Sequence, residues 1–441
     1  MTTSSASSDK SFSKFLLLWT GQLISAIGNG LTSFGLGVYV YEQTGKASAV
    51  ALVTLLAYLP YLLLSPPAGV LADRYDRRLM MILGDSLSAL GLVYIWVCML
   101  FGTARLWQIC IGVTISSVFS SLMEPAYKAS VTDLLSEEEY AKASGLIQAA
   151  GSAKYLISPF VAGLLLMHWD IKLLLIIDIA TFFETVASTF AVSRSIHKHE
   201  RKQASPFLSE LLEGWRAVSS NKGVLVLVLI TSLLTFFLGF IQTLSSPMIL
   251  AFDTVETLGT AQSICACGML ISSIVIGIVP IKSGYVKALW ASLFFMGIFM
   301  ALFGLRENMV LICIAGFLFF ATLPFANTSL DVLVRSNIEN TVQGRVWGLV
   351  SLISQMGYVV AYAISGVMAD YLFTPFLLSD GALADSVGRI IGTGPGRGIG
   401  LLILISGVLI CVTALILSRI RSVRALEDGN NLLQCSTDEH S

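Results

Sequence analysis

Several long apolar segments of this 441-residue chain contain ionisable side chains, which is unusual enough to suggest chemistry. A charge at the centre of a bilayer costs at least about 2.5–3.5 kcal/mol, so such residues mark ion pairs, proton relays or substrate pathways. A carboxylate can bind a proton, and a nearby lysine can serve as its counter-charge. The candidates for proton coupling are Glu124, Lys154, Glu184 and Asp331.

Two of these candidates are placed to meet. The segments that carry Glu124 and Lys154 form a hairpin whose turn lies near residues 132–141. At 1.5 Å per residue, the two positions lie roughly 12 and 18 Å from the end of the hairpin, and long side chains can bridge that difference. We expect them to pair when the carboxylate is unprotonated and to separate when it binds a proton. The alternative is a static structural pair.

The other buried charges have simpler interpretations. Asp85 and Asp178 lie nearer the ends of their segments, and we expect structural roles for both. Asp331 and Arg335 are four residues apart, so they face the same side of a helix and can pair with each other. The cysteines and histidines form no pattern typical of a disulfide framework or a zinc site, and we expect no cofactor or metal.

The elements that position these residues are predicted by composition. Hydrophobic residues make up 55% of the chain and charged residues 12%, with a mean hydropathy of +0.80. Soluble domains contain about 25% charged residues, so the solvent of most of this chain is lipid. A helix needs about 20 apolar residues to cross a bilayer. Twelve segments qualify, near residues 14–41, 47–72, 79–102, 106–131, 142–167, 171–193, 223–251, 258–280, 286–305, 308–334, 345–375 and 398–420.

Charge distribution predicts the orientation. With a cytoplasmic N-terminus, most of the 27 lysines and arginines lie on the cytoplasmic side, as the positive-inside rule requires. We therefore expect a multi-pass protein of the inner (plasma) membrane with both termini in the cytoplasm. The predicted domains are a first half at 1–193, a linker at 194–222, a second half at 223–421 and a disordered tail at 422–441. Ser205 and Pro206 suit the start of an amphipathic helix in the linker.

The sequence GVLADRYDRR between the second and third segments resembles the signature of the major facilitator superfamily. The matching residues are Gly69, Asp73, Arg74, Arg77 and Arg78, and Asp76 stands where the family usually has glycine. That replacement is mild because aspartate also tolerates turn conformations. The resemblance implies two pseudo-symmetric six-helix halves and a loop that latches them on the cytoplasmic side. The alternative is that the arginines only anchor the chain in the positive-inside sense.

An internal repeat would place a second copy of this loop between the eighth and ninth segments. The sequence GIVPIKSGYVK at 277–287 lies there and keeps glycine and basic positions, but Ile281 replaces the aspartate. The sequence GVMAD at 366–370 echoes GVLAD, but its segment does not correspond to the second one. We therefore interpret that echo as chance. The glycine-rich run at 391–400 lacks the lysine and the preceding strand of a phosphate-binding loop, and we interpret it as a flexible outer loop that enters the twelfth segment.

The fifth segment contains GSAKYLISPFVAG, which resembles the antiporter motif of drug-exporting members at Gly151, Pro159 and Gly163. The alternative is ordinary packing of small residues. Together with MEPA at 123–126, VQGRVWG at 342–348 and WTGQLISAIGN at 19–29, it resembles the branch of macrolide and enterobactin exporters among proton-driven antiporters. Related exporters often place an acid in the first helix where this chain has Asn29, so either a proton relay runs elsewhere or the coupling differs.

This resemblance implies a central cavity lined by the first, fourth, seventh and tenth segments. Candidate lining residues are Gln22, Asn29, Phe236, Gln242 and Asn327. We expect a monomeric transporter that exports a small amphipathic molecule, drug-, macrolide- or siderophore-like, in exchange for protons. An importer or facilitator on the same fold is one alternative, and a non-transporting receptor is another. The sequence contains no catalytic constellation, so we do not expect an enzyme. Nothing in it indicates nucleic-acid binding.

Overall fold

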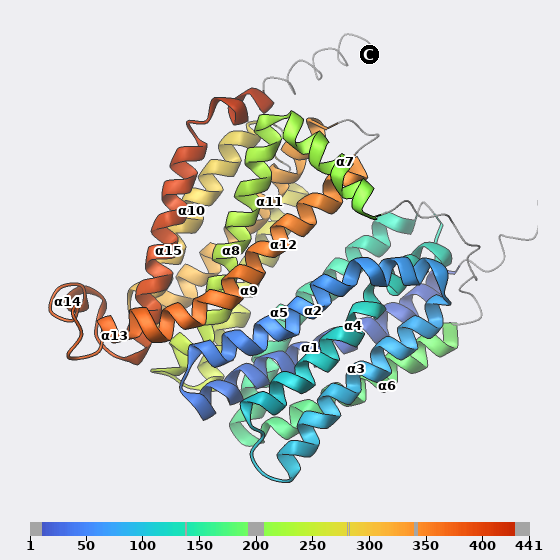
Figure 1. Ribbon diagram of the computed structural model, residues 1–441, viewed down its shortest axis with the longest axis horizontal. Coiled ribbons are helices and arrows are strands. Elements are labelled where there is room, and N and C mark those ends of the chain that lie inside the picture. Colours follow the sequence, from blue (N-terminus) through green and yellow to red (C-terminus); the bar gives the residue numbers. More distant parts are fainter. Residues whose placement is uncertain are drawn as a thin grey trace, which may run out of the picture. The chain divides into compact units, whose positions relative to one another are not determined.

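The computed structural model describes residues 11–136, 139–192, 207–279, 281, 283–338 and 343–427. Within these ranges the chain forms helices and no strand (Figure 1). Twelve of the helices are long and apolar enough to cross a membrane. This number confirms the prediction from the apolar segments, and the all-helical membrane fold is the expected one.

The chain divides into two compact units. The first unit comprises Met1–Gly45, Leu52–Ala204 and Leu258–Thr260, and the second comprises Lys46–Ala51, Ser205–Thr257 and Ala261–Ser441. The division passes through two helices, since the first turn of α2 groups with the second unit and three residues of α9 group with the first. The helices that build most of the first unit are α1 (Phe12–Thr44), α2 (Ala47–Arg74), α3 (Arg77–Leu100), α4 (Leu106–Leu134), α5 (Tyr140–His168) and α6 (Ile171–Val192).

The second unit contains seven longer helices and three short elements within the described residues. Its helices are α7 (Phe207–Ser220), α8 (Lys222–Leu250), α9 (Val255–Ile278), α10 (Tyr285–Leu305), α11 (Met309–Ser336), α12 (Gln343–Met368), the π-helix η3 (Ala369–Phe373), α13 (Thr374–Phe376), α14 (Gly388–Ile391) and α15 (Pro395–Leu417). Here α8 packs against α12 and α15, and α10 packs against α11 and α15.

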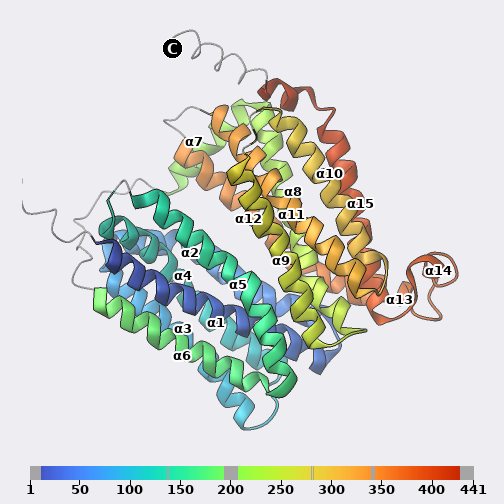
Figure 2. The same ribbon diagram turned by 180° about the vertical axis from the view of Figure 1, so that it is seen from behind.

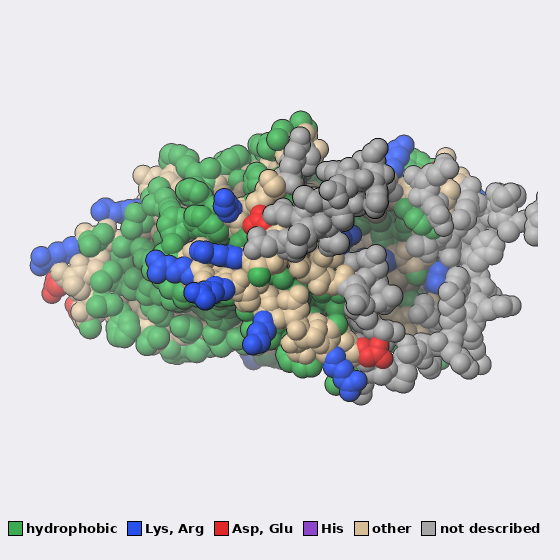
Figure 3. All heavy atoms as spheres, turned by 90° about the horizontal axis from the view of Figure 1, so that it is seen from above, with side chains coloured by type: hydrophobic (Ala, Val, Ile, Leu, Met, Phe, Trp, Pro, Cys, Tyr) green, Lys and Arg blue, Asp and Glu red, His purple; other side chains and the backbone are tan. Residues whose placement is uncertain are grey.

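The surface of the helices suits a lipid solvent. Large apolar side chains such as Phe183, Phe190 and Ile278 are about three-quarters exposed, and hydrophobic side chains cover broad areas of the described surface in Figure 3. On α6 the buried face is the polar one, because Asp178, Thr181 and its neighbours point inward while Phe183 and Phe190 point outward. Lipid favours this arrangement, since polar groups find partners only inside the protein.

A seven-residue glycine repeat fixes the position of α1. Figure 2 shows α1 between α5 and α6, and Gly21, Gly28 and Gly35 all face α6. A Cβ on Gly21 would clash with Ser188, and one on Gly28 would lie 2.8 Å from Asp178 Oδ1. A seven-residue repeat keeps one helix face on its neighbour, so α1 and α6 approach closely along several turns.

A side chain of α4 bonds the backbone of α2 beside Pro60. A proline inside a helix removes a backbone hydrogen-bond donor. The Ser117 hydroxyl accepts from the Tyr61 N–H at 3.1 Å and donates to the Ala57 carbonyl at 2.7 Å, so it bridges two backbone groups of that turn. The freed polar groups are thereby satisfied inside the protein.

Of the expectations for the linker, the glycine-rich run and the tail, the one for the tail differs from the structure. The amphipathic helix α7 is present and packs against α12, and its expected start at Ser205 and Pro206 lies outside the described residues. The glycine-rich run at 391–400 leads into α15, which begins at Pro395. Residues 421–427 are helical rather than disordered, because Val423 and Leu426 are buried and Asn337 Nδ2 donates to the Leu426 carbonyl.

Candidate functional site

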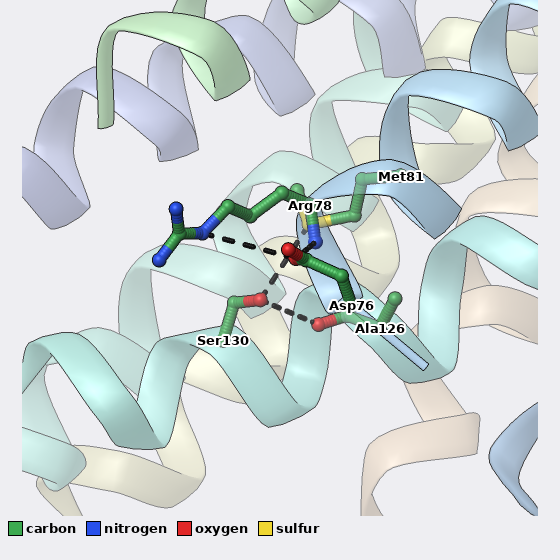
Figure 4. Close-up of polar contacts among 5 residues, drawn as sticks. All are labelled: Asp76, Arg78, Met81, Ala126 and Ser130. Carbon is green, nitrogen blue, oxygen red and sulfur yellow. Dashed lines mark hydrogen bonds and ion pairs between the residues drawn. The ribbon is translucent and has the colours of Figure 1, made fainter. Parts of the chain in front are cut away.

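The loop between α2 and α3 starts α3 with a capped end. Asp76 has φ −66° and ψ 114°, and its carboxylate accepts from the Arg78 N–H at 3.0 Å. The Arg78 Nε lies 3.8 Å from the same carboxylate (Figure 4). Asp76 is therefore the N-cap of α3.

The rest of this loop joins α3 to α4. Arg77 is buried, and its guanidinium donates to the Ala129 carbonyl at 3.1 Å. Nearby, Ser130 donates to the Ala126 carbonyl and contacts the sulfur of Met81 (Figure 4). The side chains of Asp73 and Arg74 lie outside the described residues. A Cβ on Gly69 would meet no described atom within 4 Å.

The proposed second copy of the loop has the same helix boundary. Counted from Gly69 and Gly277, Asp76 corresponds to Gly284, and both residues are the N-cap of the following helix. Gly284 has φ +78°, a conformation that glycine adopts without strain. Glycine therefore suits the N-cap of the second loop because of its backbone conformation. Aspartate suits the N-cap of the first loop because its side chain accepts a hydrogen bond from the helix. Lys282 lies outside the described residues.

The antiporter-like motif of α5 is a packing surface. A Cβ on Gly259 would clash with the Pro159 carbonyl and lie 3.2 Å from Gly163 Cα, so Gly259 rests against that stretch of α5. Ser158, which stands where related motifs have glycine, donates to the Ile27 carbonyl at 3.0 Å. Gly151 has open space around it in the described part of the chain.

The expected pair of Glu124 with Lys154 is not what the structure shows. Glu124 Oε1 lies 2.5 Å from Lys128 Nζ, four residues along α4, and both side chains are substantially exposed. Lys154 Nζ instead donates to Asn29 Oδ1 on α1 at 2.8 Å. Glu124 has a partner on its own helix, which is nearer than any on α5. The prediction of the pair was therefore wrong for this conformation.

Lys154 belongs to a buried polar cluster between α1, α5 and α6. Asp178 on α6 is fully buried, and Thr32 of α1, Thr181 of α6 and Lys154 of α5 act on its carboxylate. Thr181 Oγ1 lies 3.5 Å from Asp178 Oδ1, while its stronger bond is to the Asp178 carbonyl at 2.7 Å. With Asn29 holding the Lys154 ammonium, three helices contribute to one site. We call these five residues the α1–α5–α6 cluster.

The sequence predicts a structural role for Asp178, whereas the structure places it in one cluster with Lys154. The position of Asp178 along α6 does not indicate this cluster, because the packing of α5 and α6 on the same part of α1 is a tertiary feature. The glycine repeat of α1 could have shown it. Gly28 lies in that repeat, and Asn29 and Thr32 follow on the turn that faces the two ionisable residues.

The remaining coupling candidates lie apart from this cluster. Glu184 is exposed on the outward face of α6, next to the exposed Phe183. Asp331 in the second unit pairs with Arg335 at 3.3 Å, which confirms the alternative that the two residues bond along one helix face. Both members of that pair are about half exposed.

The candidate cavity residues divide between the two units. Gln22 and Asn29 lie on α1 of the first unit, and Asn29 is bonded to Lys154. In the second unit, Phe236 contacts the ring of Phe240 at a centroid distance of 4.8 Å. Gln242 Oε1 accepts from the Tyr362 hydroxyl at 2.7 Å, and Asn327 is exposed on α11. Each unit therefore contains some of the polar and aromatic residues that the sequence suggested as cavity lining.

Known proteins place this arrangement in a family. Residues 18–258 match the family model described as Major Facilitator Superfamily. The chain belongs to the major facilitator superfamily. It is 28% identical over 370 residues to macrolide efflux protein A of Streptococcus pyogenes, covering 81% of this chain and 89% of the relative. It is 27% identical over 317 residues to macrolide efflux protein A of Enterococcus faecalis, covering 70% of this chain and 98% of the relative.

A solved structure supports the same fold. The crystal structure of the nucleoside transporter NupG aligns with a TM-score of 0.74 at 14% sequence identity, over 92% of this chain and all of that one. At that identity the likeness concerns the fold alone. This major facilitator protein is therefore a multi-pass membrane transporter, and the recognition made from the loop and helix motifs is confirmed.

Proposed function

We propose that this major facilitator protein exports a small amphipathic molecule, with macrolides as the first class to test, in exchange for protons. The observation that carries the proposal is the similarity to two macrolide efflux proteins over most of the chain. It agrees with the α5 surface, where Pro159 and Gly163 match the antiporter motif and contact a glycine of α9. A carrier of this fold works by alternating access around a site between its repeats.

The α1–α5–α6 cluster supports the choice of protons as the coupling ion. A charged residue inside a membrane segment is expensive unless it is paired or serves transport. Lys154 is half-buried on a neutral partner, Asn29, while a fully buried carboxylate lies within its electrostatic reach. The gate role of the loop from Gly69 to Arg78 and a substrate path past Gln22 and Phe236 remain proposals. So do the cytoplasmic position of both termini, the inner membrane as location and the monomeric state.

The test is accumulation of a labelled macrolide in bacterial cells that lack their own drug pumps and express this chain. We expect lower accumulation than in cells with an empty vector, and we expect a protonophore to abolish the difference. A second measurement uses an amphipathic fluorescent dye in the same cells. Lys154→Gln should weaken efflux, whereas Lys172→Gln serves as the matched control because Lys172 is partly exposed and pairs with Asp170.

The alternatives give different results in the same assay. Higher accumulation than in the vector cells would indicate an importer. Movement in the direction of the concentration gradient, unaffected by the protonophore, would indicate a facilitator. No movement of macrolide, dye or siderophore, with the protein shown to be in the membrane, would refute the drug-export proposal and favour a receptor.

A further inference from the structure

We infer that Asp178 is the carboxyl group that binds and releases the transported proton, and that Lys154 is its counter-charge, which moves between Asn29 and Asp178. This inference rests on the proposed proton exchange, and it names the site where that exchange occurs. Asp178 takes the role that the sequence suggested for Glu124, whose carboxylate is already paired with Lys128 on its own helix.

The surroundings of Asp178 provide little support for a permanent negative charge. The residue is fully buried, and among the described residues Oδ2 has no hydrogen-bond partner. The Thr181 hydroxyl lies 3.5 Å from Oδ1 but already donates to a backbone carbonyl. The Thr32 hydroxyl also acts on the carboxylate, but it makes no hydrogen bond among the described residues. A buried carboxylate is stable only when it is paired and well hydrogen-bonded, or when it is neutral. The site as seen here therefore suits the neutral acid.

The position of Lys154 shows where the compensating charge is kept. Its ammonium donates to the neutral Asn29 amide at 2.8 Å. Within the described ranges it makes no ion pair with Asp178, although it attracts that carboxylate. The ammonium can exchange this amide for the Asp178 carboxylate once that carboxylate is charged, because an ion pair is the stronger interaction inside the protein. The structure therefore shows the arrangement expected when Asp178 carries its proton.

Lys154 is the charged side chain that α1 and α5 bring to this cluster. α1 contributes Gly28, Asn29 and Thr32, none of which titrates, and α5 contributes Lys154. α3 also packs against α6 and carries the buried Asp85. Asp85 is therefore the competitor to exclude by experiment.

The proposed step is a simple proton transfer. The neutral Asp178 acid releases a proton to water that enters beside the half-buried Lys154, and the carboxylate that remains pairs with the ammonium. Lys154 leaves Asn29 in the same step, so α1 loses a bond to α5 while α5 gains one to α6. When a proton returns to Asp178, the ammonium returns to Asn29. Proton binding thereby changes which helices α5 holds, which is a means of biasing two conformations.

The first experiment needs no substrate. Infrared difference spectra of the purified full-length protein, recorded between acidic and alkaline pH, report the C=O stretch of protonated carboxyl groups. We expect a pH-dependent band that is lost in Asp178→Asn and that changes its pH midpoint in Lys154→Gln. Asp170→Asn is the control, because Asp170 lies just before α6 and is exposed. A band that survives in Asp178→Asn and disappears in Asp85→Asn or Glu124→Gln would overturn the inference.

The second experiment separates this inference from the proposed function. In proteoliposomes with a pH gradient, the wild type should accumulate a labelled macrolide or dye, and Asp178→Asn should move it only down its own gradient. If the wild type ignores the pH gradient, proton exchange itself is refuted. If the wild type is driven by the gradient and a correctly folded Asp178→Asn is driven equally, proton exchange stands and Asp178 is excluded. Should Asp178→Asn fail to fold, Lys154→Gln is measured instead, and unchanged coupling in that variant likewise overturns the inference.

Discussion

The carboxylate of Asp370 holds the start of α2, although the GVMAD sequence that contains it appeared to be a chance echo. Asp370 Oδ1 accepts from the Ala47 N–H at 3.0 Å, and Oδ2 accepts from the Ser48 N–H at 2.8 Å. A Cβ on Gly366 would clash with Ser48, so the glycine of the same sequence also faces this turn. Asp370 lies in the short π-helix η3, and such segments are frequent at functional positions.

Replacing Asp370 with alanine should therefore loosen the first turn of α2. Loss of an N-cap costs about 0.5–2 kcal/mol, and hydrogen bonds to a charged group contribute about 1.5–3 kcal/mol each. Water can reach this end of the helix, since the residues before Ala47 are exposed, so we take the lower range, about 1–2 kcal/mol for the turn. That corresponds to roughly 5- to 30-fold faster amide exchange at Ala47 and Ser48.

Hydrogen–deuterium exchange on peptides covering residues 46–50 measures this change directly. Asp370→Asn should lie between wild type and Asp370→Ala, because the amide keeps one acceptor oxygen. Asp385→Ala is the matched control, since Asp385 is exposed in the same region of the chain. Equal exchange in wild type and Asp370→Ala, or an equal acceleration in Asp385→Ala, would refute the capping argument.

Three further predictions concern single side chains. Gly30→Val should prevent α1 from packing on α5, because a Cβ there would clash with the α5 serine hydroxyl; the yield of monodisperse protein should collapse, while Gly37→Val, with open space, should retain it. Arg397→Met should lower the free energy of unfolding in detergent by about 2–4 kcal/mol, because this buried guanidinium donates to two carbonyls at the end of α10. Arg389→Met is the control, and it should change the free energy of unfolding little because Arg389 is exposed. Asp76→Ala should destabilise the first turn of α3 by about 0.5–2 kcal/mol. Amide exchange in that turn should become faster, and unchanged exchange there would contradict the N-cap.

Most of the fold could be predicted because lipid imposes a simple rule. Backbone groups in hydrocarbon must bond within their own segment, so a long apolar run can only be a helix. Twelve such runs therefore predicted twelve spans, and the bounds differ mainly at helix ends. The tail from residue 422 was misjudged because two apolar residues in a polar segment, Val423 and Leu426, are enough to bury a short helical turn.

The candidate site was predicted less well, for a geometric reason. Distance along a hairpin placed Glu124 near Lys154, but it gave no information on the direction in which either side chain points. Glu124 faces Lys128 on its own helix, and Lys154 faces α1. Spacing along one helix was sufficient for Asp331 and Arg335, since residues four apart are neighbours whatever surrounds the helix.

The sequence by itself determined the solvent of this protein, its helices and its family, because these depend on composition, on run length and on motifs that are local in the chain. The tertiary structure alone decided which polar and charged side chains lie in the same cluster. Asn29, Lys154 and Asp178 come from three helices, and they converge because the glycines of α1 let α5 and α6 approach the same turns. The direction of a buried side chain depends on the helices packed around it, and no spacing within one segment contains that information.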